Sequence, residues 1–168
     1  MKQRPDDIVL VEGDNDLNVQ MVPIALVGWI LPTGHIDPSG RWYNPEDAYD
    51  GNINTDANPS SSYYNQPLEL TLDSPIYCNK VKICADSYGR EHFDYCAANV
   101  KVEVYYDGAY HTIHSGLLGP DYDGYPARKL WVELLIPAGT KLVSKARIRW
   151  NVLYVGIYFW EFAFWSEG

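Results

Sequence analysis

The sequence has few cysteines, few basic side chains and no long apolar run. Its three cysteines, Cys78, Cys84 and Cys96, include no CxxC pair. Such an odd, scattered set argues against a disulfide framework and against a zinc site. Thirteen basic residues oppose twenty-two acidic ones, which gives a formal charge of −9. We therefore expect no nucleic-acid partner, because binding to a phosphate backbone requires a cationic face.

Signals for membranes and export are missing as well. No segment has enough consecutive apolar residues to span a membrane. The opening residues, MKQRPDDIVLVEGDND, lack the apolar run of a signal peptide. We expect a protein that is made in the cytoplasm without a signal peptide, keeps its thiols reduced and does not insert into a membrane.

Catalytic signatures are also absent. The sequence contains no G-x-S-x-G elbow, no glycine-rich phosphate loop and no His-Glu helix motif. His111 and His114 lie three residues apart on an expected strand, so we predict that they face opposite sides of the sheet and cannot bind one metal ion. A glycosidase pair of carboxylates across a cleft stays open, because tertiary structure sets that separation. The prediction is a protein that is not an enzyme.

Aromatic side chains are abundant, and most of them carry a polar group. Six tryptophans and fourteen tyrosines accompany four phenylalanines. Such rings suit half-buried sheets and binding surfaces that keep one edge wet. The length of 168 residues and the 46% share of apolar residues fit one globular domain. We place this domain at residues 23–168 and interpret the more polar residues 1–22 as an N-terminal arm or peripheral strand.

Apolar and polar side chains alternate with a period of two. LELTLD and NKVKICA predict two strands, with Lys80 and Lys82 facing outward. The residues predicted to face inward are Leu68, Leu70, Leu72, Val81, Ile83, Val100, Val102 and Val104. Asp107-Gly108 predicts a β-hairpin, because both central residues of a type I′ turn need a positive φ.

Further strands are predicted in IALVGW, KLWVELLI and KARIRWNV, and the aromatic tail GIYFWEFAFW suits burial on both faces. No helical period extends beyond about one turn. The fold class predicted is therefore all-β, an antiparallel β-sandwich of the jelly-roll type. Two long connections, residues 30–47 and 86–99, interrupt the strands, and connections of this length are often functional.

The order of these features resembles a known family. The features are AYDGNINT, QPLELTLDSPIYCNKVKI, VKVEVYYDGAYHTI, the basic strand KARIRW and a final aromatic strand with one glutamate. This series is similar to the discoidin domain (coagulation factor V/VIII type C) of the galactose-binding-like superfamily, which includes the family 32 carbohydrate-binding modules. The resemblance covers about residues 25 to 165. It departs from the family in having no cysteine near either end.

The resemblance implies a structural calcium ion in the loop that follows Tyr49. Its expected ligands are Asp50, Asn52, Thr55 and Glu161. Hard oxygen atoms of this kind suit Ca²⁺, which takes six to eight of them in proteins. The alternative is that Asp50-Gly51 forms only a local turn and Glu161 lies on a wet rim.

The resemblance also implies a sugar site on the loops at one end of the sandwich. The candidate ligand-binding residues in these loops are His35, Asp37, Trp42, Tyr88, Arg90 and His92. Each has a structural alternative: Trp42 caps the core, Arg90 pairs with a neighbouring acid, and the histidines are ordinary loop residues.

Two functions follow as hypotheses. The first is a glycan-binding adhesion module for a neutral sugar, plausible on the surface of a bacteriophage virion. The second is a structural virion protein (a tail, adaptor or capsid-decorating component) whose sandwich binds other virion proteins. A third hypothesis, an accessory domain of a larger enzyme, has less support. The missing export signal, the reduced cysteines and the polar N-terminal arm favour a virion component, because such arms commonly become ordered only on assembly. The glycan hypothesis uses family analogy, since a fold does not fix a function.

Overall fold

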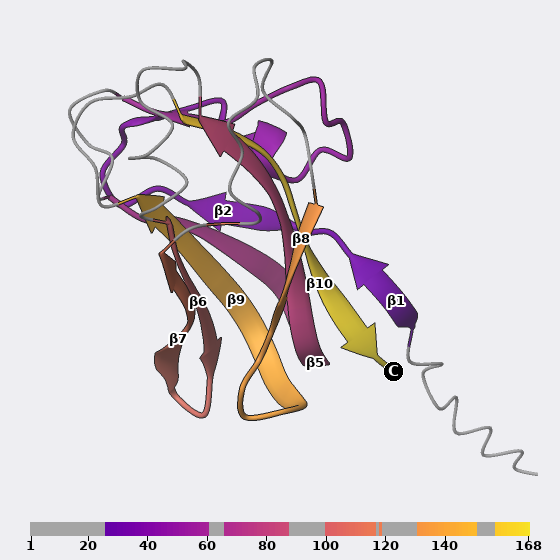
Figure 1. Cartoon of the computed structure of the whole chain (residues 1–168). Helices are drawn as coiled ribbons and strands as arrows, with labels where there is room; N and C mark the ends of the chain where they lie inside the picture. Colours follow the sequence, from indigo (N-terminus) through magenta and orange to yellow (C-terminus); the bar gives the residue numbers. More distant parts are fainter. Residues whose placement is uncertain (1–25, 61–65, 88–99, 117, 119–130, 151–156) are drawn as a thin grey trace, which may run out of the picture.

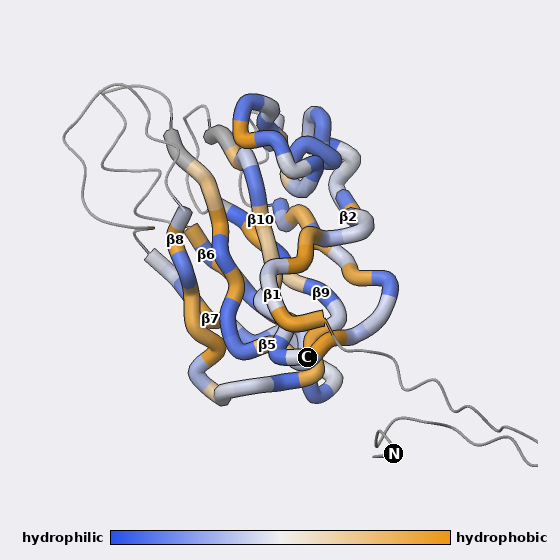
Figure 2. The backbone as a smooth tube through the Cα atoms, turned by 90° about the vertical axis from the view of Figure 1, so that its right-hand side faces the viewer, coloured by the Kyte–Doolittle hydropathy of each residue, from blue (hydrophilic) through white to orange (hydrophobic). Residues whose placement is uncertain are grey.

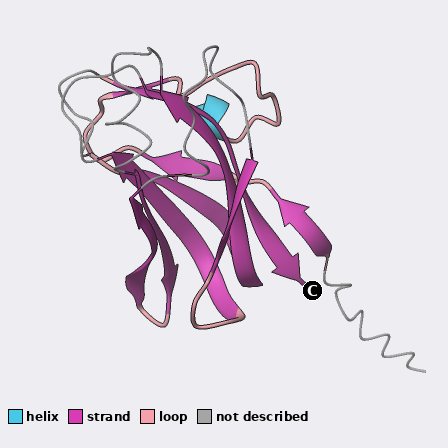
Figure 3. Ribbon diagram, viewed as in Figure 1, coloured by secondary structure: helices cyan, strands magenta, loops and turns pink. Residues whose placement is uncertain are grey.

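The computed structural model describes residues 26–60, 66–87, 100–116, 118, 131–150 and 157–168. Strands dominate these residues, and Figure 3 shows one short helical turn among them, the 3-10 helix η1 (Pro45–Ala48). The strands are β1 (Val27–Ile30), β2 (Gly34–Ile36), β3 (Trp42–Tyr43), β4 (Asn58–Pro59), β5 (Leu68–Ser87), β6 (Val100–Tyr106), β7 (Ala109–Gly116), β8 (Trp131–Leu135), β9 (Lys141–Trp150) and β10 (Ile157–Glu167). Neighbouring strands in this part of the chain pair antiparallel, so the predicted fold class is confirmed. The predicted N-terminal arm, residues 1–22, lies outside the described residues.

Hydrogen bonds join eight strands into one sheet, which folds over into two layers (Figure 1). The sheet folds along β5, because the two halves of this strand have different neighbours. Residues 69–71 lie between β9 and β2, whereas residues 81–84 lie between β8 and β10. The first layer is therefore β7-β6-β9-β5-β2, and the second is β8-β5-β10-β1. Strands β3 and β4 form a separate small sheet.

The core lies between the two layers and follows the predicted alternation. In the first layer Leu70 is paired with Ala146, and in the second Val81 is paired with Phe164; all four are fully buried. Of the residues predicted to face inward, Leu72 alone is only partly buried. Residues 159–164 of β10 are all buried, as the aromatic tail predicted. Removal of these apolar side chains from water is the main contribution to the stability of the sandwich.

Two predicted strands are one in the structure. LELTLD and NKVKICA both belong to β5, a strand of 20 residues that contains Pro75. The pairing of β5 with β9 shifts register between Thr71 and Ile76. Such a bulge accommodates a proline, which has no N–H for the ladder. The prediction of two separate strands was therefore wrong. A bulge within one strand and a loop between two strands have the same local sequence signals.

The stretch 30–47, predicted as a loop, contains β2, β3 and most of η1. Strands of two or three residues are too short to produce a readable period. The predicted hairpin is confirmed, because Asp107 and Gly108 have φ values of 50° and 81°. No helix in the ranges given above has the length and apolar character needed to cross a lipid bilayer.

Candidate functional site

Polar connections gather at one end of the sandwich, which we call the loop end. It consists of η1, the small sheet β3-β4 and the connections 37–41 and 49–57, and it lies at the top of the molecule in Figure 1. The chain near β2 is mostly hydrophilic in Figure 2. The loop end is fixed to β10, because Ala57 and Phe159 exchange two backbone hydrogen bonds of 2.8 and 3.1 Å.

Asp37 shapes the turn between β2 and β3. One carboxylate oxygen accepts hydrogen bonds from the backbone N–H and the hydroxyl of Ser39 at 3.0 and 2.6 Å. The other oxygen accepts the backbone N–H of Trp42 at 2.8 Å. Burial raises the pKa of Asp37, but these hydrogen bonds outweigh it and hold the pKa below its ordinary value. The hydrogen bonds described for the Asp37 carboxylate therefore stabilise the turn between β2 and β3.

Strand β3 directs two adjacent aromatic side chains to opposite sides. Trp42 is 7% exposed and belongs to the core cluster, which is the structural role weighed above against sugar stacking. Tyr43 is 63% exposed and lies opposite Asn58 of β4. Our sequence reasoning missed Tyr43. Neighbouring residues on a strand point to opposite sides, so the exposure of Tyr43 follows only from the structural finding that Trp42 is buried.

His35 lies on β2, with its Nδ1 atom 2.9 Å from the hydroxyl oxygen of Tyr49. The imidazole is half-buried, so this contact fixes the ring against the loop end. The remaining predicted sugar contacts, Tyr88, Arg90 and His92, lie outside the described residues.

The loop from Asp50 to Thr55 is built around the Asp50 carboxylate. Its two oxygens accept the backbone N–H of Asn52 and the hydroxyl of Thr55, each at 2.8 Å. The Asn52 side chain instead accepts the backbone N–H of Asn54 at 3.1 Å. Gly51 has a φ of 82°, a left-handed conformation that glycine adopts without strain. Asp50, Asn52 and Thr55, predicted as metal ligands, therefore lie together in one tight turn.

Glu161 of β10 joins this loop from below. It is 1% exposed, and its Oε1 atom accepts the backbone N–H of Asn52 at 2.8 Å. Its Oε2 atom is buried without a hydrogen-bond partner. Burial and the neighbouring Asp50 carboxylate raise the pKa of Glu161 to about 7. The wet rim suggested as an alternative is therefore wrong, because the loop covers this carboxylate.

The oxygen atoms of the Asp50–Thr55 loop and of Glu161 suit calcium, although only the Asp50 and Glu161 carboxylates carry charge. In the portion of the chain that the structure describes, no group of three or more His, Cys, Asp or Glu side chains is arranged to hold a metal. A cation here would combine the carboxylates of Asp50 and Glu161 with neutral oxygens, such as backbone carbonyls, which Ca²⁺ accepts. The unpartnered Oε2 of Glu161 is the observation that fits such a cation, since a buried carboxylate is costly unless it is compensated.

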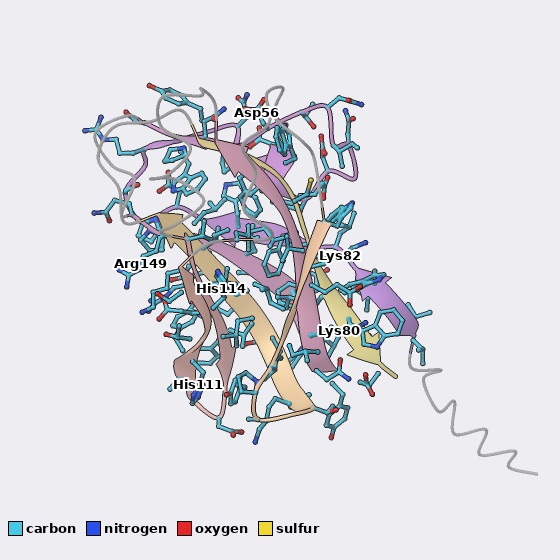
Figure 4. The ribbon with its side chains drawn as sticks, viewed as in Figure 1. Asp56, Lys80, Lys82, His111, His114 and Arg149 are labelled. Carbon is cyan, nitrogen blue, oxygen red and sulfur yellow. The ribbon has the colours of Figure 1, made fainter. Side chains whose placement is uncertain are left out.

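The two histidines of β7 do not lie as predicted. His111 is paired with Val104 and His114 with Val102, and both valines face the core. The register shift between these pairs adds one residue to β7, so histidines three apart share one side of the sheet. Each imidazole contacts a different backbone carbonyl, that of Tyr106 or Gly116. Figure 4 shows them well separated along β7.

Comparison with known proteins gives a match in fold alone. No protein-family model and no curated protein sequence matches the chain. CBM32-1 from a family 31 glycoside hydrolase of Clostridium perfringens aligns with a TM-score of 0.60 at 14% identity, covering 81% of this chain and 96% of its own. The family 32 module of C. perfringens NanJ, solved with galactose, has a TM-score of 0.54 at 15% identity, and the alignment covers 84% of this chain and 93% of the module. The CBM32 of AlyQ, solved with 4,5-unsaturated mannuronic acid, has a TM-score of 0.56 at 15% identity, and the alignment covers 82% of this chain and 97% of the module.

The chain has the fold of family 32 carbohydrate-binding modules. This is the galactose-binding-like β-sandwich that the sequence resemblance implied, so that prediction is confirmed. At 14–15% identity the likeness shows the fold and does not show the ligand.

Besides Asp50 and Glu161, the sandwich has a second cluster of charged side chains. This cluster lies on the outer side of β6, β9 and β7. Glu103 is 4% exposed and forms ion pairs with Arg147 at 2.6 Å and Lys101 at 3.0 Å. Burial opposes ionisation of Glu103, but hydrogen bonds from these two cations lower its pKa to about 2. The Arg147 guanidinium also lies 4.0 Å from the ring centroid of Tyr110, whose hydroxyl donates to Glu69 at 2.6 Å. Both oxygens of the Glu103 carboxylate thus have a cationic partner.

Proposed function

We propose that this chain is a non-catalytic glycan-binding module for adhesion, with its sugar site at the loop end. The observation that supports this best is Tyr43, a residue that is 63% exposed on a fold shared with carbohydrate-binding modules. An exposed phenol offers a face for the C–H groups of a sugar and a hydroxyl for hydrogen bonding. The galactose bound to the NanJ module supports a neutral sugar as the ligand class.

The frame around Tyr43 is rigid, which favours binding because little conformational entropy is then lost. Asp37 fixes the preceding turn, and the backbone N–H of Ser60 donates to the carbonyl of Arg41 at 2.7 Å. Asn44, directly after Tyr43, has a left-handed φ of 46°, and its backbone carbonyl accepts the N–H of Asp47 in η1 at 3.0 Å. We include the predicted contacts in the β5–β6 connection, Tyr88, Arg90 and His92, in the same proposal.

The test is a glycan array probed with the full chain and with a Tyr43→Ala variant. We expect the variant to lose affinity for the bound glycan by about tenfold, which corresponds to about 1.4 kcal/mol. The matched control is Tyr77→Ala, since Tyr77 is 57% exposed on β5 and lies outside the loop end. Equal binding by the Tyr43 variant and the wild type would disprove the site. Trp42→Ala is unsuitable, because this ring is buried and its loss would destabilise the core.

We also propose Ca²⁺ as a structural cofactor of the loop end. Asp50 and Glu161 would supply the charged ligands, while Asn52 and Thr55 shape the loop that surrounds them. The cation would neutralise two adjacent carboxylates and fix the loop to β10. Its support is the unpartnered, buried Oε2 of Glu161. Thermal unfolding with added Ca²⁺ and with chelator tests this, and an unchanged midpoint would remove calcium from the proposal.

The alternative role, a structural component of a bacteriophage virion, stays a prediction. It would require a surface that binds other virion proteins, whereas the observations above concern a sugar site. Chromatography over a range of concentrations separates the two roles. A concentration-dependent oligomer that binds no glycan on the array would favour assembly.

A further inference from the structure

The outer side of the second layer carries three tryptophans around two lysines, away from the loop-end site. We call this the tryptophan–lysine face; it consists of Trp29, Lys80, Lys82, Trp131 and Trp165. It spans all four strands of the layer, since Trp29 is on β1, Trp165 on β10, the lysines on β5 and Trp131 on β8. Figure 4 shows Lys80 and Lys82 between β8 and β1.

Strand register explains why these residues meet. Trp29 is paired with Trp165, and their ring centroids lie 5.2 Å apart in an edge-to-face arrangement. Lys82 is paired with Ala163 on one side and Glu133 on the other. Because Ala163 is small, the Lys82 side chain can extend over β10 toward Trp29. The lysine nitrogen accordingly lies 4.6 Å from the centroid of Trp29.

The two lysines differ in their charge partners. Lys80 forms an ion pair of 2.8 Å with Glu133. Lys82 lies between two indoles, 4.6 Å from the centroid of Trp29 and 4.2 Å from that of Trp131, and forms no ion pair with any residue that the structure describes. Contact with an indole face attracts a cation but does not neutralise its charge. Among the described residues, Lys82 is thus a positioned cation without a counter-ion.

This face is also accessible. Trp131 is 39% exposed, and Trp29 and Trp165 are partly exposed. A platform of indoles offers area for the C–H surface of sugar rings, and an ammonium group at its centre offers a partner for one carboxylate. The net charge of −9 opposes a densely charged polyanion such as nucleic acid, so one acidic group within a sugar chain is the better complement.

We propose that the tryptophan–lysine face is a second binding site, which takes a carboxylate-bearing sugar such as a uronic acid. The indoles of Trp29 and Trp131 contact the sugar rings, and Lys82 forms an ion pair with the carboxylate. This site lies on the outer face of the sheet, so it does not depend on Tyr43 or on the loop end.

The experiment measures binding to the full chain by calorimetry, with a galacturonic acid trimer and a neutral galactose trimer as probes. We expect Lys82→Gln to weaken binding of the acidic trimer about tenfold and to leave the neutral trimer unaffected. The control is Lys141→Gln, which removes a partly exposed lysine already paired with Asp107. Added salt should weaken binding of the acidic trimer by the wild type, since exposed charge pairs are screened.

Three outcomes would overturn the proposal: no binding of the acidic trimer, equal binding by wild type and Lys82→Gln, or tighter binding of a hexa-aspartate peptide, which would make the face a protein-docking surface. Tyr43→Ala keeps this test separate from the proposed loop-end function. That variant should affect the neutral trimer and leave the acidic trimer unaffected. If Tyr43→Ala alone weakened binding of the acidic trimer, this sugar would bind at the loop end instead.

Discussion

Two glutamates are buried in the described part of this sandwich, and they lie in opposite electrostatic environments. Glu103 and Glu161 are 4% and 1% exposed, so burial disfavours ionisation of both. Glu103 is paired across the sheet with Arg147, and its pKa is lowered to about 2. Glu161 is paired with Cys84 and lies beside Asp50, and its pKa is raised to about 7.

The difference shows that the neighbours of a buried carboxylate matter more than its burial. Glu103 lies among cations, so its cluster is complete as it stands. Glu161 and Asp50 place two carboxylates side by side at the loop end, and one oxygen of Glu161 has no partner. The first region stabilises the sheet by itself, whereas the second would be stabilised by a bound cation. Variants at Glu103's partner Arg147 and at Glu161 test this contrast.

The largest effect is expected from Arg147→Met, which removes the main cation beside Glu103. We expect the free energy of unfolding to fall by about 3 kcal/mol, because a buried carboxylate loses its closest ion-pair partner. Urea unfolding measures this change, and Lys141→Met, which breaks the exposed pair with Asp107, is the control with an expected loss below about 1 kcal/mol. Similar losses in the two variants would mean that Glu103 does not depend on Arg147.

A smaller effect is expected from pH. The folded pKa of Glu161 lies above its ordinary value of 4.5, so its contribution to stability is complete below pH 4.5 and is lost as the pH rises toward about 7. Glu103 acts in the opposite sense, since its contribution is present above pH 4.5 and is lost as the pH falls toward about 2. In chelator, the loss through Glu161 should be on the order of 2–3 kcal/mol. Unfolding curves of the wild type and Glu161→Gln that run parallel between pH 4.5 and 7 would contradict this assignment.

The smallest effect is expected from Glu161→Gln at pH 8, and its sign depends on calcium. In chelator we expect the variant to be more stable than the wild type by about 1–2 kcal/mol, because an uncompensated buried charge has been removed. Saturating Ca²⁺ should stabilise only the wild type and reverse this order. Thermal unfolding under both conditions checks the prediction, with Glu167→Gln at the exposed end of β10 as the control. A constant order of stability would exclude a cation at Glu161.

Much of the fold was predictable because it is locally encoded. The positions of Leu68, Leu70, Val81 and Ile83 followed from period-two alternation, and the β6–β7 hairpin followed from Asp107-Gly108. The clustering of Asp50, Asn52 and Thr55 with Glu161 was implied by resemblance alone, since 109 positions separate Asn52 from Glu161.

The errors have a common physical origin in bulges and short strands. A bulge let β5 continue past Pro75, and another placed His111 and His114 on one side of β7. Tyr43 was missed because a strand of two residues has no readable period.

The sequence by itself determined the longer strands and most of the side chains that face the core, because alternation and turn chemistry act between neighbours along the chain. Tertiary structure alone decided which charges meet. It brought Arg147 to Glu103, Asp50 to Glu161, and two indoles to Lys82. These contacts depend on strand order and register, which arise only when distant segments pack together.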